Sequence, residues 1–346
     1  MTKQQSAEKR AKNPLIQLFN RPILLLVLTA LFWGGNMVAG KMAVGNIAPT
    51  NLVAGRFLLG FLVILPFALP HFKTDWPAIR KNLLFLAFAG GVGFAGFNLF
   101  LYLGAQYTTA VNGAIEQASI PMMVMMANFL FYGERTKLLQ IVGVIATIFG
   151  VLFVATAGNP MRLLTLDINV GDGLILIACV IYAAYSVLLR YRPRIHWMSF
   201  LATTFLFATV STLLFELLVG GLPTMIANFA SVTTTGWLLV VYTGLFPSII
   251  SQLFYARGVE LIGANRASLF INALPLFGAV LSVIIIGEAL QTYEAAYQEA
   301  LAAHNLKLFG LEISGDLTED LRFLQALYTW MSETGVSWPQ VFFDWF

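Results

Sequence analysis

The sequence has few charged residues. Asp, Glu, Lys and Arg make up 11% of its 346 residues, whereas apolar residues make up 58%. Soluble globular chains carry roughly 25% charged residues, so this composition excludes an ordinary soluble protein and predicts one that resides in a lipid bilayer. The single cysteine, Cys179, excludes a disulfide framework and a Cys-based metal site, and we interpret it as a small core residue.

Residues that carry enzymatic chemistry are equally scarce. The three histidines, His71, His196 and His304, fall in predicted loops or in the C-terminal segment, and no P-loop Gly-Lys-Ser/Thr motif occurs. No paired carboxylates or histidine cluster stand within the apolar segments. We therefore predict no enzyme, cofactor, metal or nucleic-acid partner. The expected partners are the bilayer and a small-molecule substrate, and a homodimer is compatible with the sequence.

Nine segments are long and apolar enough to cross a bilayer, which requires about 20 such residues. They are 23–40, 51–70, 82–103, 111–132, 138–157, 172–189, 198–219, 236–256 and 266–287. The first 22 residues are polar and basic, and the apolar segment after them leads into further spans. We therefore interpret that segment as a first transmembrane helix and not as a cleaved signal.

The distribution of Lys and Arg predicts the orientation of the spans. With the N-terminus in the cytoplasm, fifteen basic residues of the N-terminus and the loops lie on the cytoplasmic side, and only Lys41 and Arg162 lie on the opposite side. Cytoplasmic loops are enriched in Lys and Arg. The sequence therefore predicts a cytoplasmic N-terminus, and nine spans then place the end of the chain outside.

Residues 84–134 recur without a gap as residues 238–288, at a shift of 154 positions. A second alignment, at a shift of 149, matches the segments before them and pairs Trp33 with Tyr182, Asn36 with Tyr185, and Lys41 with Arg190. The first unit then contributes five spans, and because five is odd, the second unit must be inverted. Duplicated hydrophobic units of this kind are typical of secondary transporters, whose binding site lies where the repeats meet.

Several motifs resemble a known family. The segments LFWGGNMVAGKMAV at 31–44 and PTNLVAGRF at 49–57, with two P-x(11)-GE segments that end at Glu134 and Glu288, are similar to the EamA transporters of the drug/metabolite transporter superfamily. The resemblance extends from residue 23 to about residue 290. It implies a ten-helix carrier of two inverted repeats that moves small metabolites, often amino acids or related compounds, outward across a bacterial inner membrane.

The C-terminal segment departs from that pattern. The counterpart of the fifth span, 292–311, contains Glu294, Glu299 and Lys307, and each charge at a helix centre costs roughly 2.5 to 3.5 kcal/mol on insertion scales. The tenth helix is therefore predicted to be absent. We predict an all-α polytopic membrane protein with two inverted EamA-type repeats, nine transmembrane helices and a non-spanning helical tail. Its parts are a basic N-terminus (1–22), a first repeat (23–157), a linker (158–170), a second repeat of four helices (171–290) and the tail (291–346).

A carrier needs polar or aromatic side chains at mid-membrane, because unpaired polar groups are costly in lipid unless they face a cavity or one another. Matched positions in the two units supply candidates, and Asn98 also matches Gln252. The predicted substrate-binding residues are Trp33, Asn36, Asn98, Tyr102, Glu116, Gln117, Tyr182, Tyr185, Gln252 and Tyr255. The alternative is that these amides and tyrosines only form hydrogen bonds between helices.

Three further features have open interpretations. Glu116 could bind a substrate ammonium or a coupling proton, or it could snorkel or pair with Lys41. Arg56 could pair with an anionic substrate, although we expect it to reach toward the lipid headgroups. Pro121 and Pro275 are expected to bend their helices at mid-length.

The function predicted from these features is secondary transport, as an exporter of small organic metabolites such as amino acids or related compounds, by alternating access. The expected location is a bacterial-type inner membrane, crossed several times. The alternative is a non-transporting scaffold or sensor whose C-terminal tail binds a partner.

Overall fold

The structure, a computed structural model, describes residues 19–117, 119–133, 169–263, 267 and 270–287, and every element in these ranges is helical. The α-helices are α3 (Pro22–Met42), α4 (Pro49–Lys81), α5 (Leu83–Phe88), α6 (Phe97–Gly104), α7 (Ala110–Gln117), α8 (Ile120–Tyr132), α11 (Val170–Leu188), α12 (Trp197–Ala230), α13 (Thr234–Leu245), α14 (Ser251–Ile262) and α16 (Leu274–Ile286). Two segments are π-helical, η1 (Ala89–Gly96) and η3 (Phe246–Ile250), and two are short 3-10 helices, η2 (Leu189–Tyr191) and η4 (Phe270–Ala273).

Within the described ranges, seven stretches are long and apolar enough to cross a membrane. They are Pro22–Met42, Pro49–Lys81, Leu83–Gly104, Ala110–Tyr132, Val170–Tyr191, Trp197–Ala230 and Thr234–Ile262. Each overlaps one segment predicted from hydropathy, and the ninth predicted segment corresponds to the shorter apolar helix α16. The fifth predicted span, 138–157, and the tail, 291–346, lie outside the described residues.

The bounds of several helices repeat at the sequence shift of 154. Helix α16 begins and ends 154 positions after α8, and the two helices end at Gly133 and Gly287, each with a φ of 64°. That left-handed conformation favours glycine, which has no Cβ to clash with the following carbonyl. Residues 92–96 of η1 likewise match η3. The duplicated sequence thus forms the same local elements twice.

The two matched prolines do not lie at mid-helix, and our expectation that they bend continuous helices there is wrong. Pro121 and Pro275 occupy the second positions of α8 and α16; the turn residue Ser119 directly precedes α8, and the 3-10 helix η4 directly precedes α16. A proline is tolerated in the first turn because the N–H that it lacks would have no helical acceptor. Each proline therefore marks a helix start.

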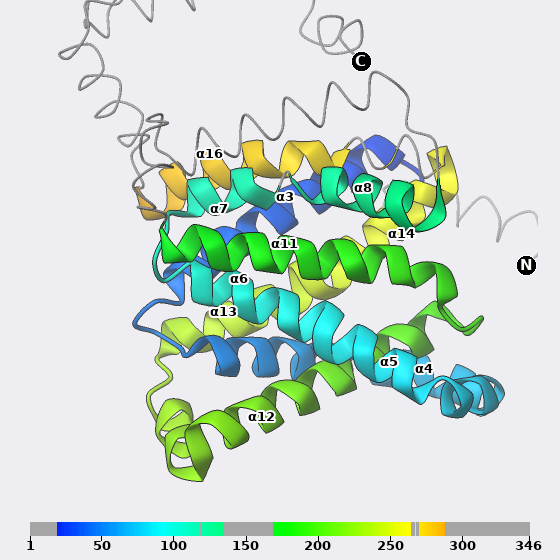
Figure 1. The fold of residues 1–346 in the computed structure, drawn as a ribbon, viewed down its shortest axis with the longest axis horizontal. Coiled ribbons are helices and arrows are strands. Elements are labelled where there is room, and N and C mark those ends of the chain that lie inside the picture. Colours follow the sequence, from blue (N-terminus) through cyan, green and yellow to red (C-terminus); the bar gives the residue numbers. More distant parts are fainter. Residues whose placement is uncertain (1–18, 118, 134–168, 264–266, 268–269, 288–346) are drawn as a thin grey trace, which may run out of the picture. The chain divides into compact units, whose positions relative to one another are not determined.

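Figure 1 shows the helices lying side by side, with most axes running broadly across the view. Helix α3 packs against α14 and α16, α4 packs against α12 and α13, and α11 packs against α6 and α8. Glycines allow the closest approaches. A Cβ at Gly34 of α3 would lie 2.8 Å from the backbone nitrogen of Gly278 in α16, and one at Gly104 would lie 2.7 Å from the carbonyl oxygen of Gly171. Small residues at such contacts are typical of helix packing in membranes.

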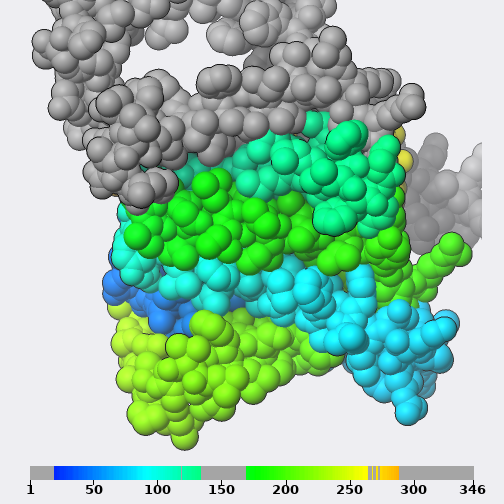
Figure 2. Space-filling view, in the orientation of Figure 1, coloured from blue at the N-terminus to red at the C-terminus, as the bar shows by residue number. Residues whose placement is uncertain are grey.

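The outer surfaces of several helices are apolar. Helices α8 and α12 lie on the face that Figure 2 shows, and their exposed residues include Phe129, Leu130 and Phe131 on α8 and Leu218 and Val219 on α12. Water-soluble monomers rarely expose contiguous patches of this kind. These surfaces suit contact with lipid chains.

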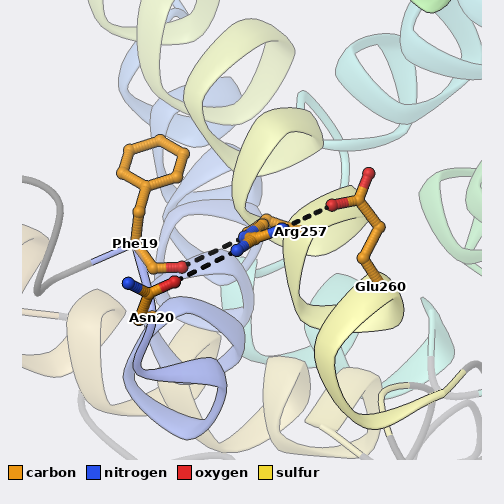
Figure 3. Close-up of polar contacts among 4 residues, drawn as sticks. All are labelled: Phe19, Asn20, Arg257 and Glu260. Carbon is orange, nitrogen blue, oxygen red and sulfur yellow. Dashed lines mark hydrogen bonds and ion pairs between the residues drawn. The ribbon is translucent and has the colours of Figure 1, made fainter. Parts of the chain in front are cut away.

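The middle of α14 contacts the chain that precedes α3 through Arg257 (Figure 3). The Arg257 guanidinium donates hydrogen bonds to the Phe19 carbonyl oxygen at 3.2 Å and to Asn20 Oδ1 at 3.1 Å, and it pairs with Glu260 at 2.9 Å. The side chain of Glu260 is 66% exposed. Exposed ion pairs of this kind contribute little stability, about 0 to 1 kcal/mol, so the two hydrogen bonds to the N-terminal chain fix the position.

Candidate functional site

The most polar buried group of the described residues surrounds Arg56, in the second turn of α4. Its Nη1 atom donates to Asn36 Oδ1 at 2.9 Å, to Asn98 Oδ1 at 2.6 Å and to the Tyr102 hydroxyl. Its Nε and Nη2 atoms donate to Ser248 Oγ at 3.0 and 2.7 Å. We call these five residues the Arg56 cluster. It joins α3, α4 and α6 to η3, so both repeated units contribute to it.

The two π-helical segments help to position this cluster. In η1, the Phe94 carbonyl oxygen accepts a hydrogen bond from Asn98 Nδ2 at 2.9 Å, which directs Asn98 Oδ1 toward the guanidinium. In η3, Ser248 Oγ donates to the Thr243 carbonyl oxygen at 2.7 Å, which leaves its lone pairs for Arg56. π-helical turns inside α-helices are frequent at functional sites.

Arg56 does not reach the headgroup region as we expected. It is 3% exposed, and its hydrogen bonds go to side chains within the helix bundle. The sequence-based expectation rested on its distance from the helix start. That distance does not reveal that α3, α6 and η3 surround this turn of α4.

All partners of the Arg56 guanidinium among the described residues are neutral. No carboxylate of these residues lies within ion-pair distance, and the nearest rings, Phe57 and Tyr102, lie 5.1 and 5.8 Å from the guanidinium carbon. Nη2 has two hydrogens but donates one hydrogen bond, to Ser248, so the other lacks an acceptor in the described part of the chain. Ring contact and hydrogen bonds stabilise the cation, but no opposite charge from these residues compensates it.

Four predicted residues form a second group, which we call the aromatic group: Trp33, Tyr182, Tyr185 and Tyr255. The rings of Trp33 and Tyr255 are 5.5 Å apart, those of Tyr182 and Tyr185 are 5.8 Å apart, and Tyr182 lies near Tyr255. Trp33 Nε1 donates to the Pro247 carbonyl oxygen of η3 at 3.1 Å. Trp33 and Asn36 lie one turn apart on α3, so the aromatic group and the Arg56 cluster are neighbours.

Phenylalanines extend the aromatic group toward η1. The ring of Tyr182 lies 5.0 Å from that of Phe97, and the ring of Tyr185 lies 5.2 Å from that of Phe94. Gly93 makes this packing possible, because a Cβ there would clash with the Tyr185 ring. Separations of this size fall in the range that favours aromatic pairing.

Glu116 and Gln117 lie on α7 and have different partners. Gln117 Nε2 donates to the Gly113 carbonyl oxygen of its own helix at 3.0 Å. Glu116 is fully buried, and its carboxyl lies beside that of Asp172 at the start of α11. Neither snorkelling of Glu116 nor an ion pair with Lys41 occurs, because Lys41 Nζ donates to the carbonyl oxygens of Ala105 and Thr108, at 3.3 and 2.7 Å.

The contact of Glu116 with Asp172 also corrects the prediction that the apolar segments hold no paired carboxylates. The two residues are 56 positions apart in the sequence, and only the packing of α11 against α7 brings them together. Asp172 is the first residue of the predicted span 172–189, and the repeat alignment does not relate it to Glu116. Among the described residues that were searched, no group of three or more His, Cys, Asp or Glu side chains could hold a metal ion.

Gln252 is the predicted residue with the weakest link to either group. It is half-buried in α14 and forms no side-chain hydrogen bond with the described residues.

Two residues near the site, Ser248 and Tyr242, were not predicted from the sequence. Tyr242 donates to the Phe32 carbonyl oxygen at 3.4 Å, and its hydroxyl occupies the space beside Gly35. In the sequence, the Pro247–Ser248 pair interrupts the apolar span 236–256, and this interruption indicates the position of η3.

Comparisons with known proteins identify the family. The profile of the EamA-like transporter family matches the chain twice, at residues 20–156 and 169–297. The chain is 28% identical over 264 residues to "Uncharacterized transporter YyaM" of Bacillus subtilis, covering 76% of this chain and 85% of that protein. It is 26% identical over 288 residues to "Protein PagO" of Salmonella typhimurium, covering 78% and 86%.

A solved crystal structure shares the fold. It is 18% identical in sequence, has a TM-score of 0.51, and the match covers 81% of this chain and 94% of that one. With both repeated units matched and more than half of the chain covered, the protein belongs to the EamA-like transporter family and is a multi-pass membrane transporter.

Proposed function

We propose that the protein is a secondary carrier that exports small organic metabolites such as amino acids or related compounds, by alternating access. The observation that supports this most is Arg56, which is 3% exposed among neutral partners at the junction of the two repeated units. An intramembrane ionisable residue without a compensating charge is expensive, and such residues mark substrate pathways.

The chemistry of Arg56 favours a substrate with a carboxylate. A guanidinium binds a carboxylate through paired, charge-assisted hydrogen bonds, which are about twice as strong as neutral ones. Asn36, Asn98 and Ser248 hold the guanidinium from three sides, so it is oriented before a ligand arrives. A bound carboxylate would supply the missing negative charge.

The aromatic group suits the rest of such a substrate. Small-molecule sites are mostly apolar, with a few polar groups that fix the orientation of the ligand. The rings of Trp33, Tyr182 and Tyr255 provide apolar surface near the Arg56 cluster. An amino acid or a related compound has both features, a carboxylate and an apolar side chain.

Access to Arg56 requires the helices around it to separate, because its side chain is closed off from solvent. Alternating access provides this separation, since one repeated unit moves relative to the other around the binding site. In this proposal the two units are inverted, the N-terminus is cytoplasmic and the membrane is a bacterial-type inner membrane. The bias of fifteen basic residues against two supports this orientation.

Counterflow of radiolabelled amino acids in proteoliposomes tests the proposal. Arg56→Gln should abolish uptake, because it removes the only charge of the Arg56 cluster. Arg257→Gln is the matched control, a partly exposed arginine in the middle of α14, and it should retain uptake. The proposal is wrong if wild-type protein carries no amino acid or related compound, or if both variants behave alike.

Alanine variants test the wider site. The substituted residues are Trp33, Asn36, Asn98, Tyr182, Gln252 and Tyr255. Each alanine variant should lower transport while membrane insertion is unchanged. Wild-type transport activity in all six variants would refute a shared binding cavity.

A further inference from the structure

Glu116 of α7 and Asp172 of α11 form a carboxyl pair at the junction of the two repeated units. Glu116 is 0% exposed and Asp172 is 2% exposed. Their side chains are close enough for their charges to interact. Both Oε atoms of Glu116 and Oδ1 of Asp172 nevertheless lack a hydrogen-bond partner among the described residues.

The missing hydrogen bonds have a direct chemical cause. An ionised carboxylate only accepts hydrogen bonds, so two carboxylates that face each other cannot bond. Two like charges at short range and out of water also destabilise each other, and such pairs keep one proton between them. One proton would remove the repulsion and supply a donor.

The described surroundings of the pair contain no cation that could replace this proton. Helix α7 packs against α3, α11 and α16. Helix α16 has no titratable residue, and α11 presents Asp172 and Cys179, whose Sγ donates to the Glu116 carbonyl oxygen at 3.6 Å. Lys41, the one charged residue of α3, donates to the two carbonyl groups of the loop before α7.

The two carboxyls differ in their environments. Asp172 lies in the first turn of α11, where the helix dipole stabilises negative charge, and its carboxyl interacts with the Thr108 hydroxyl. Glu116 has neither advantage. The proton therefore belongs on Glu116, from where it can be donated to Asp172 Oδ1.

We propose that Glu116 and Asp172 form a proton-binding site, which takes up one proton from water and returns it as the two repeated units move. Only the coupling of this proton to transport rests on the proposed carrier function, because proton binding can be measured on the purified protein alone. No covalent bond to carbon changes in this step, and the net charge of the pair alternates between −1 and −2.

The first experiment measures the pH dependence of unfolding in detergent. From about pH 4.3, the ordinary pKa of a glutamate, up to the pH at which the folded pair ionises, the folded state holds one proton more than the unfolded state, so the ratio of folded to unfolded protein falls about tenfold per pH unit; above that pH it levels off. Glu116→Gln should remove this pH dependence of stability, since the introduced amide can donate a hydrogen bond to Asp172 without taking up a proton from water. At high pH this variant should be more stable than wild type, an outcome opposite to that of a damaged core. Asp172→Asn should also remove this pH dependence, and the control Glu260→Gln, at an exposed carboxylate, should retain it.

A second set of measurements, with sodium, distinguishes proton binding from the binding of a metal cation. At fixed pH, sodium chloride should stabilise wild type no more than choline chloride does. A sodium-specific shift that Glu116→Gln abolishes would overturn the proposal in favour of a sodium site. Wild-type pH dependence in both Glu116→Gln and Asp172→Asn would overturn it entirely.

Transport then tests coupling separately. A pH gradient across proteoliposomes should accelerate wild-type counterflow and leave Glu116→Gln unaffected. If no substrate is carried but the pH dependence of unfolding is as expected, the proposed function fails and the proton site stands.

Discussion

Tyr102→Phe removes one hydroxyl from the Arg56 cluster and leaves the ring in place. The hydroxyl donates to Asn36 Oδ1 at 2.8 Å and accepts a hydrogen bond from Arg56. Tyr102 is 1% exposed, so water does not replace these bonds. Asn36 and Arg56 keep their other partners, and no buried group is left entirely unpaired.

The expected loss of stability follows from these two bonds. A neutral hydrogen bond contributes about 1 kcal/mol and one to a charged group about 1.5 to 3 kcal/mol. Bonds between membrane helices average about 0.6 kcal/mol, because the unfolded chain in the membrane also finds partners. The variant should therefore lose about 1 to 3 kcal/mol, measured by unfolding in mixed micelles.

Tyr107→Phe is the matched control for this measurement. Tyr107 is 59% exposed, and its hydrogen bond with Asn169 is made by its backbone carbonyl oxygen, which the substitution retains. It should change stability by less than about 0.5 kcal/mol, the usual range for surface substitutions. Equal stability of the two variants would refute the view that the Arg56 cluster holds α3, α4 and α6 together.

Three further predictions concern packing and orientation. Gly104→Ala should lower the free energy of unfolding by about 1 to 3 kcal/mol, because the added Cβ would lie 2.7 Å from the Gly171 carbonyl oxygen. Gly173→Ala is the control and should leave the stability unchanged, because nothing lies within 4 Å of its Cβ. Thermal unfolding in detergent compares the two variants. Trp33→Phe should lower the free energy of unfolding by about 1 kcal/mol, because it removes the hydrogen bond from Trp33 Nε1 to the Pro247 carbonyl oxygen of η3. Trp237, whose side chain is exposed, is the control, and Trp237→Phe should leave the stability unchanged in the same assay. Single cysteines at positions 41 and 162 should react with an impermeant thiol reagent on intact cells, and those at 80, 135 and 192 should not; the reverse pattern would refute the orientation.

The helical architecture could be predicted from hydropathy and from the internal repeat. Each described stretch that is long enough to span a membrane overlaps a predicted segment, because length and apolar composition are local properties of the sequence. The matched positions also predicted Asn36 and Asn98, and Tyr102 lies one turn after Asn98; all three contact Arg56. Repeats of this kind place equivalent residues near a shared axis, so the alignment carries three-dimensional information.

Other parts of the site depend on tertiary packing that the alignment does not contain. Arg56 stands near a helix start in the sequence, yet three other elements enclose it. Asp172 and Glu116 meet only because α11 packs against α7. Pro121 and Pro275 mark helix starts, since a turn directly precedes α8 and the 3-10 helix η4 directly precedes α16. For Arg56 and for the Glu116–Asp172 pair, the deciding neighbours are distant in sequence.

The most direct test of the central claim is ligand stabilisation of the purified protein. Amino acids should raise its unfolding temperature, because a ligand at 100 times its dissociation constant adds roughly 2.7 kcal/mol to the stability of the folded state. The matching amino-acid amides and decarboxylated amines should not, since they lack the carboxylate that Arg56 would bind, and Arg56→Gln should lose the response. Equal stabilisation by acid and amide, or an undiminished response in Arg56→Gln, would contradict the assignment of Arg56 as the substrate carboxylate site.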